Sequence, residues 1–107
     1  MEKSNMECAD RLLCSRYTMR CLKAIREKQI ARETVYKKDL LTICNLAALN
    51  DFIDDAVKSK LIEVEKITDP QIRYILTLTE KGIEVSDTFL ALRDIIGDEN
   101  HSDNART

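Results

Sequence analysis

The sequence is poor in the residues that build most catalytic and cofactor sites. Its 107 residues include two glycines, one proline, one histidine and no tryptophan. The two glycines, Gly82 and Gly97, are too few for a glycine-rich phosphate-binding loop. The only histidine, His101, lies in a polar C-terminal tail, which excludes histidine-based nucleophilic and general-base arrangements. We therefore expect neither an enzyme nor a bound cofactor.

The cysteines also lack the spacing of a metal site. Zinc sites usually draw their ligands from close sequence pairs, and none of the four cysteines belongs to a CxxC pair. Free cysteines are most often small buried side chains, and this is the preferred interpretation of Cys8, Cys14, Cys21 and Cys44. An intersubunit disulfide involving Cys8, Cys14 or Cys21 is the alternative that the sequence leaves open.

Long apolar runs are missing as well. No segment approaches the roughly 20 apolar residues of a membrane span, and the N-terminal residues MEKSNMECADR lack the apolar part of a signal peptide. We expect a cytoplasmic protein without membrane contact. With 44% hydrophobic and 34% charged residues, the chain is typical of one globular domain over residues 1–107. The polar ends, residues 1–5 and 98–107, are expected to be disordered tails.

Charge is unevenly distributed along the chain. Residues 1–38 carry ten Lys and Arg against five Asp and Glu, a net +5, and residues 39–107 carry seven against fourteen, a net −7. The two parts sum to the formal net charge of −2. Such asymmetry is compatible with a basic surface for nucleic acid, with complementary surfaces of a dimer, or with no specific role.

Residues 38–79 contain signals for a short helix, a turn, a longer helix and two strands, in that order. A short helix is predicted over residues 39–43, and Asn45 is suited to cap the helix that begins at Leu46. That second helix has apolar residues at steps of three and four, which predicts one buried stripe: Leu49, Phe52, Ile53, Ala56 and Val57.

At Leu61 the apolar period changes to two, as in a half-buried strand. Ile62 and Val64 are expected on one face, with glutamates on the other. A turn is predicted over residues 69–72, after which a second strand places Tyr74, Leu76 and Leu78 on one face: the two strands form a hairpin. Residues 34–36 are a candidate third strand.

This order resembles the small winged-helix transcription regulators of the MarR and PadR type. Two segments carry the resemblance: Lys58–Glu63 (KSKLIE) is similar to the family's (K)xGLI(E) passage, and Leu78–Gly82 (LTEKG) is similar to its LTxxG passage. The resemblance covers roughly residues 19–96. It implies an α+β, mostly helical fold: a winged helix-turn-helix with a two- or three-stranded antiparallel wing and extra N- and C-terminal helices. Where the family usually has Gly, this chain has Lys60, which would accept a left-handed backbone at modest cost.

Further helices are predicted on both sides of this core. Residues 6–18 form a helical arm that either continues into the next helix or breaks near Ser15, and the resemblance implies that such an arm commonly packs on a partner subunit. The last helix, residues 83–96, is capped by Thr79 and ends at Gly97. Its apolar residues are too widely spread for one contact face, so we expect a homodimer through the N- and C-terminal helices.

The resemblance implies a DNA-binding transcription regulator that acts on double-stranded DNA. In a helix-turn-helix, residues near the start of the second helix enter the major groove. There Asn50 can pair with adenine, and Ala47 or Ala48 can contact a thymine methyl group. Lysines at the start of the first helix suit phosphate contact. The expected DNA-binding residues are Lys37, Lys38, Ala47, Ala48, Asn50, Lys58, Lys66 and Arg73.

Acidic residues on the same helix support a second interpretation. Asp51, Asp54 and Asp55 are expected on a solvated face, where carboxylates repel phosphates. The alternative function is therefore a winged-helix protein-protein interaction module that does not bind DNA and docks through this acidic helix.

Overall fold

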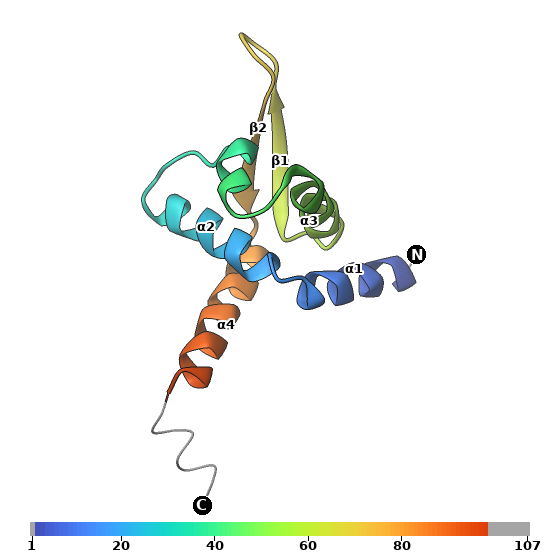
Figure 1. Ribbon diagram of the computed structural model, residues 1–107. Coiled ribbons are helices and arrows are strands. Elements are labelled where there is room, and N and C mark those ends of the chain that lie inside the picture. The colour runs from blue at the N-terminus through green and yellow to red at the C-terminus, as the bar shows by residue number, and fades with distance from the viewer. Residues whose placement is uncertain (1, 99–107) are drawn as a thin grey trace, which may run out of the picture.

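The computed structural model describes the backbone of residues 2–98 and the side chains of residues 6–98 (Figure 1). The predicted C-terminal tail beyond Asp98, including His101, lies outside the described residues, as does Met1. The elements are α1 (Glu2–Cys14), α2 (Thr18–Ile30), the 3-10 helix η1 (Lys37–Thr42), α3 (Leu46–Lys58), β1 (Ile62–Ile67), β2 (Arg73–Leu78) and α4 (Glu80–Ile96). The fold is thus α+β and mostly helical, with a two-stranded antiparallel sheet, as the sequence predicts at this level.

The core lies where α2, η1 and α3 meet the hairpin of β1 and β2. Each of these elements buries an apolar face in it, as the spacing of the apolar residues requires. The largest completely buried side chains are Leu22, Ile25, Leu40, Leu49, Ile62 and Leu76. The strands pair from Ile62 opposite Leu78 to Ile67 opposite Arg73, which places Tyr74, Leu76 and Leu78 on one face as predicted.

The predicted N-terminal helical region is two helices. The break falls after Cys14, and the Ser15 hydroxyl accepts a hydrogen bond of 3.1 Å from the Tyr17 backbone N–H. Helix α1 begins at Glu2, earlier than the expected start at Met6. Because Cys14 and Cys21 lie on different helices, they do not share a helix face.

Residues 34–36 do not form a full third strand among the described residues. Tyr36 makes a single antiparallel bridge with Ile75, and the Leu76 N–H donates to the Val35 carbonyl at 2.9 Å. Gln29 adds a side-chain link to the other end of β2, because its Oε1 accepts from the Leu78 N–H at 2.6 Å. The sheet is therefore two-stranded with a short added bridge.

Helix α3 is followed by a residue with a left-handed backbone, at the position where the winged-helix regulators that the sequence resembles usually have glycine. Lys60 has φ of 63°, as its place in the motif predicts. Its N–H donates to the Val57 carbonyl at 3.0 Å, and the Leu61 N–H donates to the Ala56 carbonyl at 2.8 Å. This hydrogen-bond pair defines a Schellman ending, which turns the chain from α3 into β1.

The two segments that carry the resemblance contact each other. The Thr79 hydroxyl caps α4 by accepting from the Gly82 N–H at 3.0 Å, and it donates to the Lys60 carbonyl at 2.7 Å. A Cβ placed on Gly82 would lie 2.0 Å from the Leu61 carbonyl oxygen, so only glycine fits here. The first turn of α4 is therefore fixed directly to the passage between α3 and β1.

The far end of α4 extends away from this body (Figure 1). Helix α4 packs on α2 and β2, and its buried and half-buried residues all precede Ala91. Its second half exposes Leu92, Ile95 and Ile96, the last of them 82% exposed. No helix within residues 2–98 is both long and apolar enough to cross a membrane.

The expected burial of the cysteines is confirmed for Cys8, Cys21 and Cys44 and is wrong for Cys14, which is exposed at the end of α1. Burial raises the pKa of the Cys21 thiol to about 12, with a further contribution from the neighbouring Cys44. Because Cys8 and Cys21 are buried, Cys14 is the accessible thiol for any intersubunit disulfide.

Candidate nucleic-acid interface

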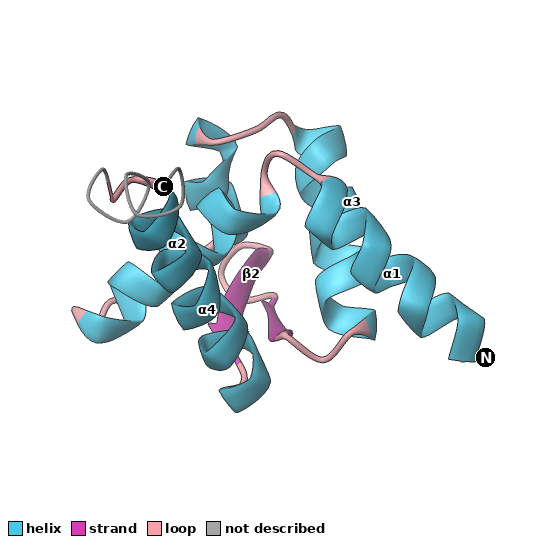
Figure 2. Cartoon of the chain, turned by 90° about the horizontal axis from the view of Figure 1, so that it is seen from below, coloured by secondary structure: helices cyan, strands magenta, loops and turns pink. Residues whose placement is uncertain are grey.

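Helix α3 lies between α1 on one side and the hairpin on the other (Figure 2). Its inner face, with Leu49, Phe52 and Ala56, is buried in the core. Its outer face exposes Ala47 and polar residues that include Asn50. We call the side that contacts α1 the α1 flank, and the side that faces η1, β1 and β2 the hairpin flank.

The hairpin flank has two adjoining grooves. The α3–hairpin groove, about 390 Å³, is lined by Lys37, Asn50, Ile53, Asp54, Val57, Lys58, Val64 and Tyr74. The η1–hairpin groove, about 230 Å³, is lined by Tyr36, Lys37, Lys38, Leu41, Leu46, Ile72, Arg73 and Tyr74. Lys37 and Tyr74 line both grooves and join them into one surface.

This surface brings together most of the residues that the sequence selects for DNA contact. Lys37, Asn50 and Lys58 line the α3–hairpin groove, and Lys38 and Arg73 line the η1–hairpin groove with Lys37. These residues come from three separate elements, η1, α3 and β2, so only the folded chain places them side by side.

The remaining selected residues lie outside the two grooves. Ala47 is exposed on the outer face of α3. Ala48 is half-buried and lines the cleft of the α1 flank. Lys66 is exposed in β1, directly opposite Tyr74 in the hairpin.

Two tyrosines hold cations of the hairpin flank in place. The Lys37 ammonium lies 5.1 Å from the centroid of the Tyr74 ring, and the Arg73 guanidinium lies 5.5 Å from that of Tyr36. Cation–π contacts of this kind restrict the side chains before any ligand arrives. Neither tyrosine is among the expected DNA-binding residues, although each is adjacent in the sequence to one of the expected cations.

The start of η1 is partly occupied by a carboxylate. Asp39 Oδ2 accepts a hydrogen bond of 3.0 Å from the Tyr36 backbone N–H, and it lies 3.6 Å from Lys28 Nζ. The expected role of free backbone N–H groups at this helix start is therefore reduced. Positive charge there comes from the ammonium groups of Lys37 and Lys38.

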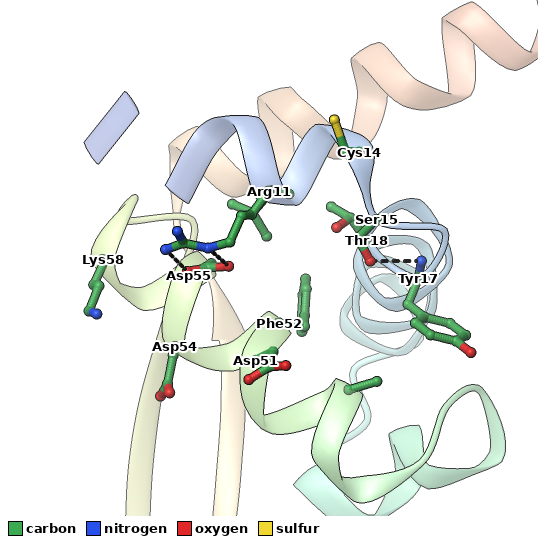
Figure 3. A pocket seen from close by; sticks show the side chains of 12 residues that line it. Arg11, Cys14, Ser15, Tyr17, Thr18, Asp51, Phe52, Asp54, Asp55 and Lys58 are labelled. Atoms are coloured by element: carbon green, nitrogen blue, oxygen red, sulfur yellow. Dashed lines mark hydrogen bonds and ion pairs between the residues drawn. The ribbon is translucent and has the colours of Figure 1, made fainter. Parts of the chain in front are cut away.

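The α1 flank is organised around one ion pair (Figure 3). Arg11 Nε donates to Asp55 Oδ2 at 3.0 Å, and Arg11 Nη2 donates to Asp55 Oδ1 at 2.8 Å. This bidentate geometry is the strong form of a guanidinium–carboxylate contact. The hydrogen bonds from Arg11 lower the pKa of Asp55 despite its burial, and those to Asp55 raise the pKa of Arg11.

The expectation that Asp55 lies on a solvated face is therefore wrong. Asp55 is only 7% exposed, because α1 packs across this side of α3. The spacing of the three aspartates along the helix could not reveal this, since the partner of Asp55 is 44 residues away in the sequence. Asp51 and Asp54 are exposed as predicted.

Between α1 and α3 lies a cleft of about 650 Å³ (Figure 3). Its lining combines apolar residues, Leu12 and Phe52, with the carboxylates of Asp51 and Asp54. The inner side of α1 thus packs on its own chain, and Met6 and Leu13 on the other side of α1 are exposed. Within the described part of the chain, no three His, Cys, Asp or Glu residues are grouped to hold a metal ion.

Comparison of the chain with protein-family models, with curated proteins and with solved structures found no match. The assignment of a function therefore depends on the geometry of the two flanks of α3.

Proposed function

We propose that the chain is a winged helix-turn-helix that binds double-stranded DNA as a homodimeric, cytoplasmic transcription regulator. In this assignment η1 and α3 are the two helices of the motif, α3 is the recognition helix, and the hairpin is the wing. The observation that supports it most is the convergence of Lys37, Lys38, Asn50, Lys58 and Arg73 on the hairpin flank.

The cations of this surface suit the DNA backbone. Lys38 is exposed, and Lys37 and Arg73 are held at the groove edges by Tyr74 and Tyr36. Contacts from Lys and Arg to phosphates supply sequence-independent affinity and fix the register of a protein on the duplex. They would place the outer face of α3 over the major groove.

Base contacts would come from the exposed N-terminal half of α3. Asn50 can form two hydrogen bonds with adenine, and the Ala47 methyl group can contact a thymine methyl group. Asp51 and Asp54 on the same side of the helix lower the affinity for phosphates but accept hydrogen bonds from the cytosine amino group. Because Arg11 pairs with Asp55 on the α1 flank, this carboxylate adds less unfavourable charge near the DNA.

A homodimer would cover the apolar end of α4. Leu92, Ile95 and Ile96 are exposed within one and a half turns of helix, next to the half-buried Phe89. Exposed apolar surface of this kind marks an interface with another protein, and two-fold dimers are the commonest oligomers. The exposed side of α1, with Met6 and Leu13, would add to this interface.

The experiment that tests DNA binding is a fluorescence-anisotropy titration of two duplexes, a random sequence and the region upstream of the chain's own gene. At roughly 50 and 200 mM salt, affinity should fall steeply with salt, with a slope of about −0.9 for each phosphate contact. The upstream duplex should bind more tightly than the random duplex. Absence of salt-dependent binding to either duplex at the lower salt concentration would refute the proposal.

Charge-neutralising variants locate the interface in the same assay. Lys38→Gln and Arg73→Gln should each reduce the salt slope by about 1. Lys81→Gln is the matched control, because Lys81 is exposed in the first turn of α4 and lines neither groove. An equal change of the salt slope in all three variants would show that the hairpin flank does not contact the DNA.

The homodimer is tested by light scattering of the protein on a sizing column. The wild-type chain should have twice the mass of the monomer, and Leu92→Glu with Ile96→Glu should have the monomer mass. Leu13→Glu tests the contribution of α1 separately. A monomeric wild-type protein at micromolar concentration would contradict this part of the proposal.

A further inference from the structure

The η1–hairpin groove is lined by three exposed apolar side chains. Leu41, Leu46 and Ile72 are 44%, 53% and 63% exposed, and all three line this groove. A duplex offers mostly phosphates, sugars and polar base edges, with the thymine methyl as its main apolar group in the major groove. Exposed apolar residues gathered at one site indicate contact with another protein.

The charge of the same groove has one sign. Lys37, Lys38 and Arg73 are among its lining residues, and no Asp or Glu is. The α3–hairpin groove and the cleft of the α1 flank both include carboxylates. A groove lined by one sign of charge attracts a ligand of the opposite sign and orients it. The ligand that fits is therefore both apolar and acidic.

The size of the groove indicates a chain segment rather than a free small molecule. Its volume of about 230 Å³ is below the roughly 300–1,000 Å³ of typical small-molecule pockets, and it suits one or two large side chains. It opens into the α3–hairpin groove along Lys37 and Tyr74, so a segment can continue past it. Tyr36 and Tyr74 provide the rigid aromatic surfaces that are common in such docking sites.

We propose that the η1–hairpin groove docks an acidic amphipathic segment of a partner protein. Apolar side chains of the segment cover Leu46 and Ile72, and its carboxylates pair with Lys38 and Arg73. Because the same cations are assigned to the DNA backbone, the partner and duplex DNA exclude each other. This exclusion rests on the proposed function, whereas docking itself does not.

The test begins with a phage library that displays random peptides of about 12 residues, long enough to span both grooves. Panning on the full chain should enrich sequences with two or more Asp or Glu around an aromatic or aliphatic residue. A fluorescent synthetic peptide of the consensus sequence then serves as the probe for anisotropy titrations. Enriched peptides that are basic or lack carboxylates would overturn the proposal, as would a library that yields no binder.

Variants of single apolar residues locate the peptide. Ile72→Ser and Leu46→Ser should weaken the peptide about tenfold and change the affinity for duplex DNA less than about twofold, because neither residue carries charge. Ile30→Ser is the matched control, since Ile30 is 64% exposed at the end of α2 and lines neither groove. Equal losses in all three variants would overturn the docking site.

Two further measurements separate the possible occupants. The peptide should displace a bound fluorescent duplex, and simultaneous binding of both would overturn the exclusion while docking stands. If the wild-type chain binds the peptide but no duplex, the proposed function fails and docking is supported alone. A change of mass in Ile72→Ser on the sizing column would instead identify the groove as an interface between copies of this chain and overturn the proposal.

Discussion

On its α1 flank, α3 presents carboxylates, and on its hairpin flank it presents apolar side chains beside cations and one carboxylate, Asp54, which lines both sides. Asp51 and Asp55 lie one turn apart towards α1, and Ile53 and Val57 lie one turn apart towards the hairpin. The one buried carboxylate is neutralised by Arg11, whereas the cations of the hairpin flank have no carboxylate partner in the ion pairs of the described residues. Helix α3 thus takes part in an ion pair on its α1 flank and in an exposed cationic surface on its hairpin flank.

This difference teaches how a helix with a net negative charge could belong to the proposed DNA-binding surface. The i, i+4 repeat separates two sets of residues on opposite sides of the outer face. Of the three carboxylates that would repel DNA, Asp55 is paired on the α1 flank, and positive charge is supplied on the hairpin flank by η1 and β2. Four variants test this division.

The largest expected effect is on the DNA affinity of the hairpin flank. The double variant Lys37→Glu with Lys38→Glu should lower affinity for duplex DNA by roughly two to three orders of magnitude at low salt, because two phosphate contacts become repulsive. Arg16→Glu with Arg20→Glu makes the same charge change on exposed residues at the α1–α2 side. Equal losses in the two double variants would mean that net charge, not the hairpin flank, determines binding.

The next effect concerns the support of the hairpin flank. Gly82→Ala should lower the free energy of unfolding by about 2–3 kcal/mol, because the new Cβ meets a backbone carbonyl that cannot move aside easily. Gly97→Ala is the control, since its Cβ would lie 3.4 Å from the nearest atom. Urea unfolding gives both values. A loss as small as that of Gly97→Ala would show that the α4 contact does not hold the hairpin.

A smaller effect, on stability, is expected for the ion pair of the α1 flank, and it depends on pH. Arg11 lowers the pKa of Asp55 in the folded chain, so this pair stabilises the fold above the unfolded pKa of about 4. That contribution is lost as the pH falls through the lowered pKa. Arg11→Gln should therefore reduce stability at pH 7, and its difference from the wild type should shrink towards pH 3.

Urea unfolding at several pH values measures this effect. Arg20→Gln removes another exposed arginine and should show a difference from wild type that does not depend on pH in this range. If Arg11→Gln loses the same stability at every pH, the contact between α1 and α3 depends on packing rather than on the ion pair.

The smallest expected effect is a gain of stability. Lys60→Gly should raise the free energy of unfolding by about 0.5–1 kcal/mol, because glycine adopts the left-handed backbone without strain. Lys58→Gly, two residues earlier in the regular helix, should lower it by a similar amount. Thermal unfolding of both variants checks the opposite signs. A loss in both would show that the Lys60 side chain stabilises this turn.

Local features of the fold could be predicted from the sequence because they depend on neighbours in the chain. The caps at Asn45 and Thr79 are both formed, with the side-chain oxygens accepting from Ala48 and Gly82. The start of α3 at Leu46 is confirmed, as is the left-handed backbone of Lys60. The apolar periods predicted most of the buried side chains, including Ile62, Leu76 and Leu78. They were wrong for Val57 and Val64, which are 42% and 39% exposed because both line the α3–hairpin groove.

Features that depend on distant partners could not be predicted. In the sequence, Asp55 cannot be distinguished from its exposed neighbours, but in the fold α1 covers it. Ala48, expected at the DNA, lines the cleft of the α1 flank instead. Leu46 fits the first turn of an ordinary helix, but in the fold its side chain lines a groove with Ile72 from the hairpin. Three-dimensional proximity, rather than residue type, decides each of these cases.

The contact between Arg11 and Asp55 also joins two helices that are synthesised at different times. Helix α1 is synthesised before α3, on which it packs, because Asp55 follows Arg11 by 44 residues. At roughly 5–20 residues per second, this delay is about 2–9 s. During that interval Cys8 and Leu12, which the finished fold buries, have no surface to cover them. The arm is made early and folds into place late.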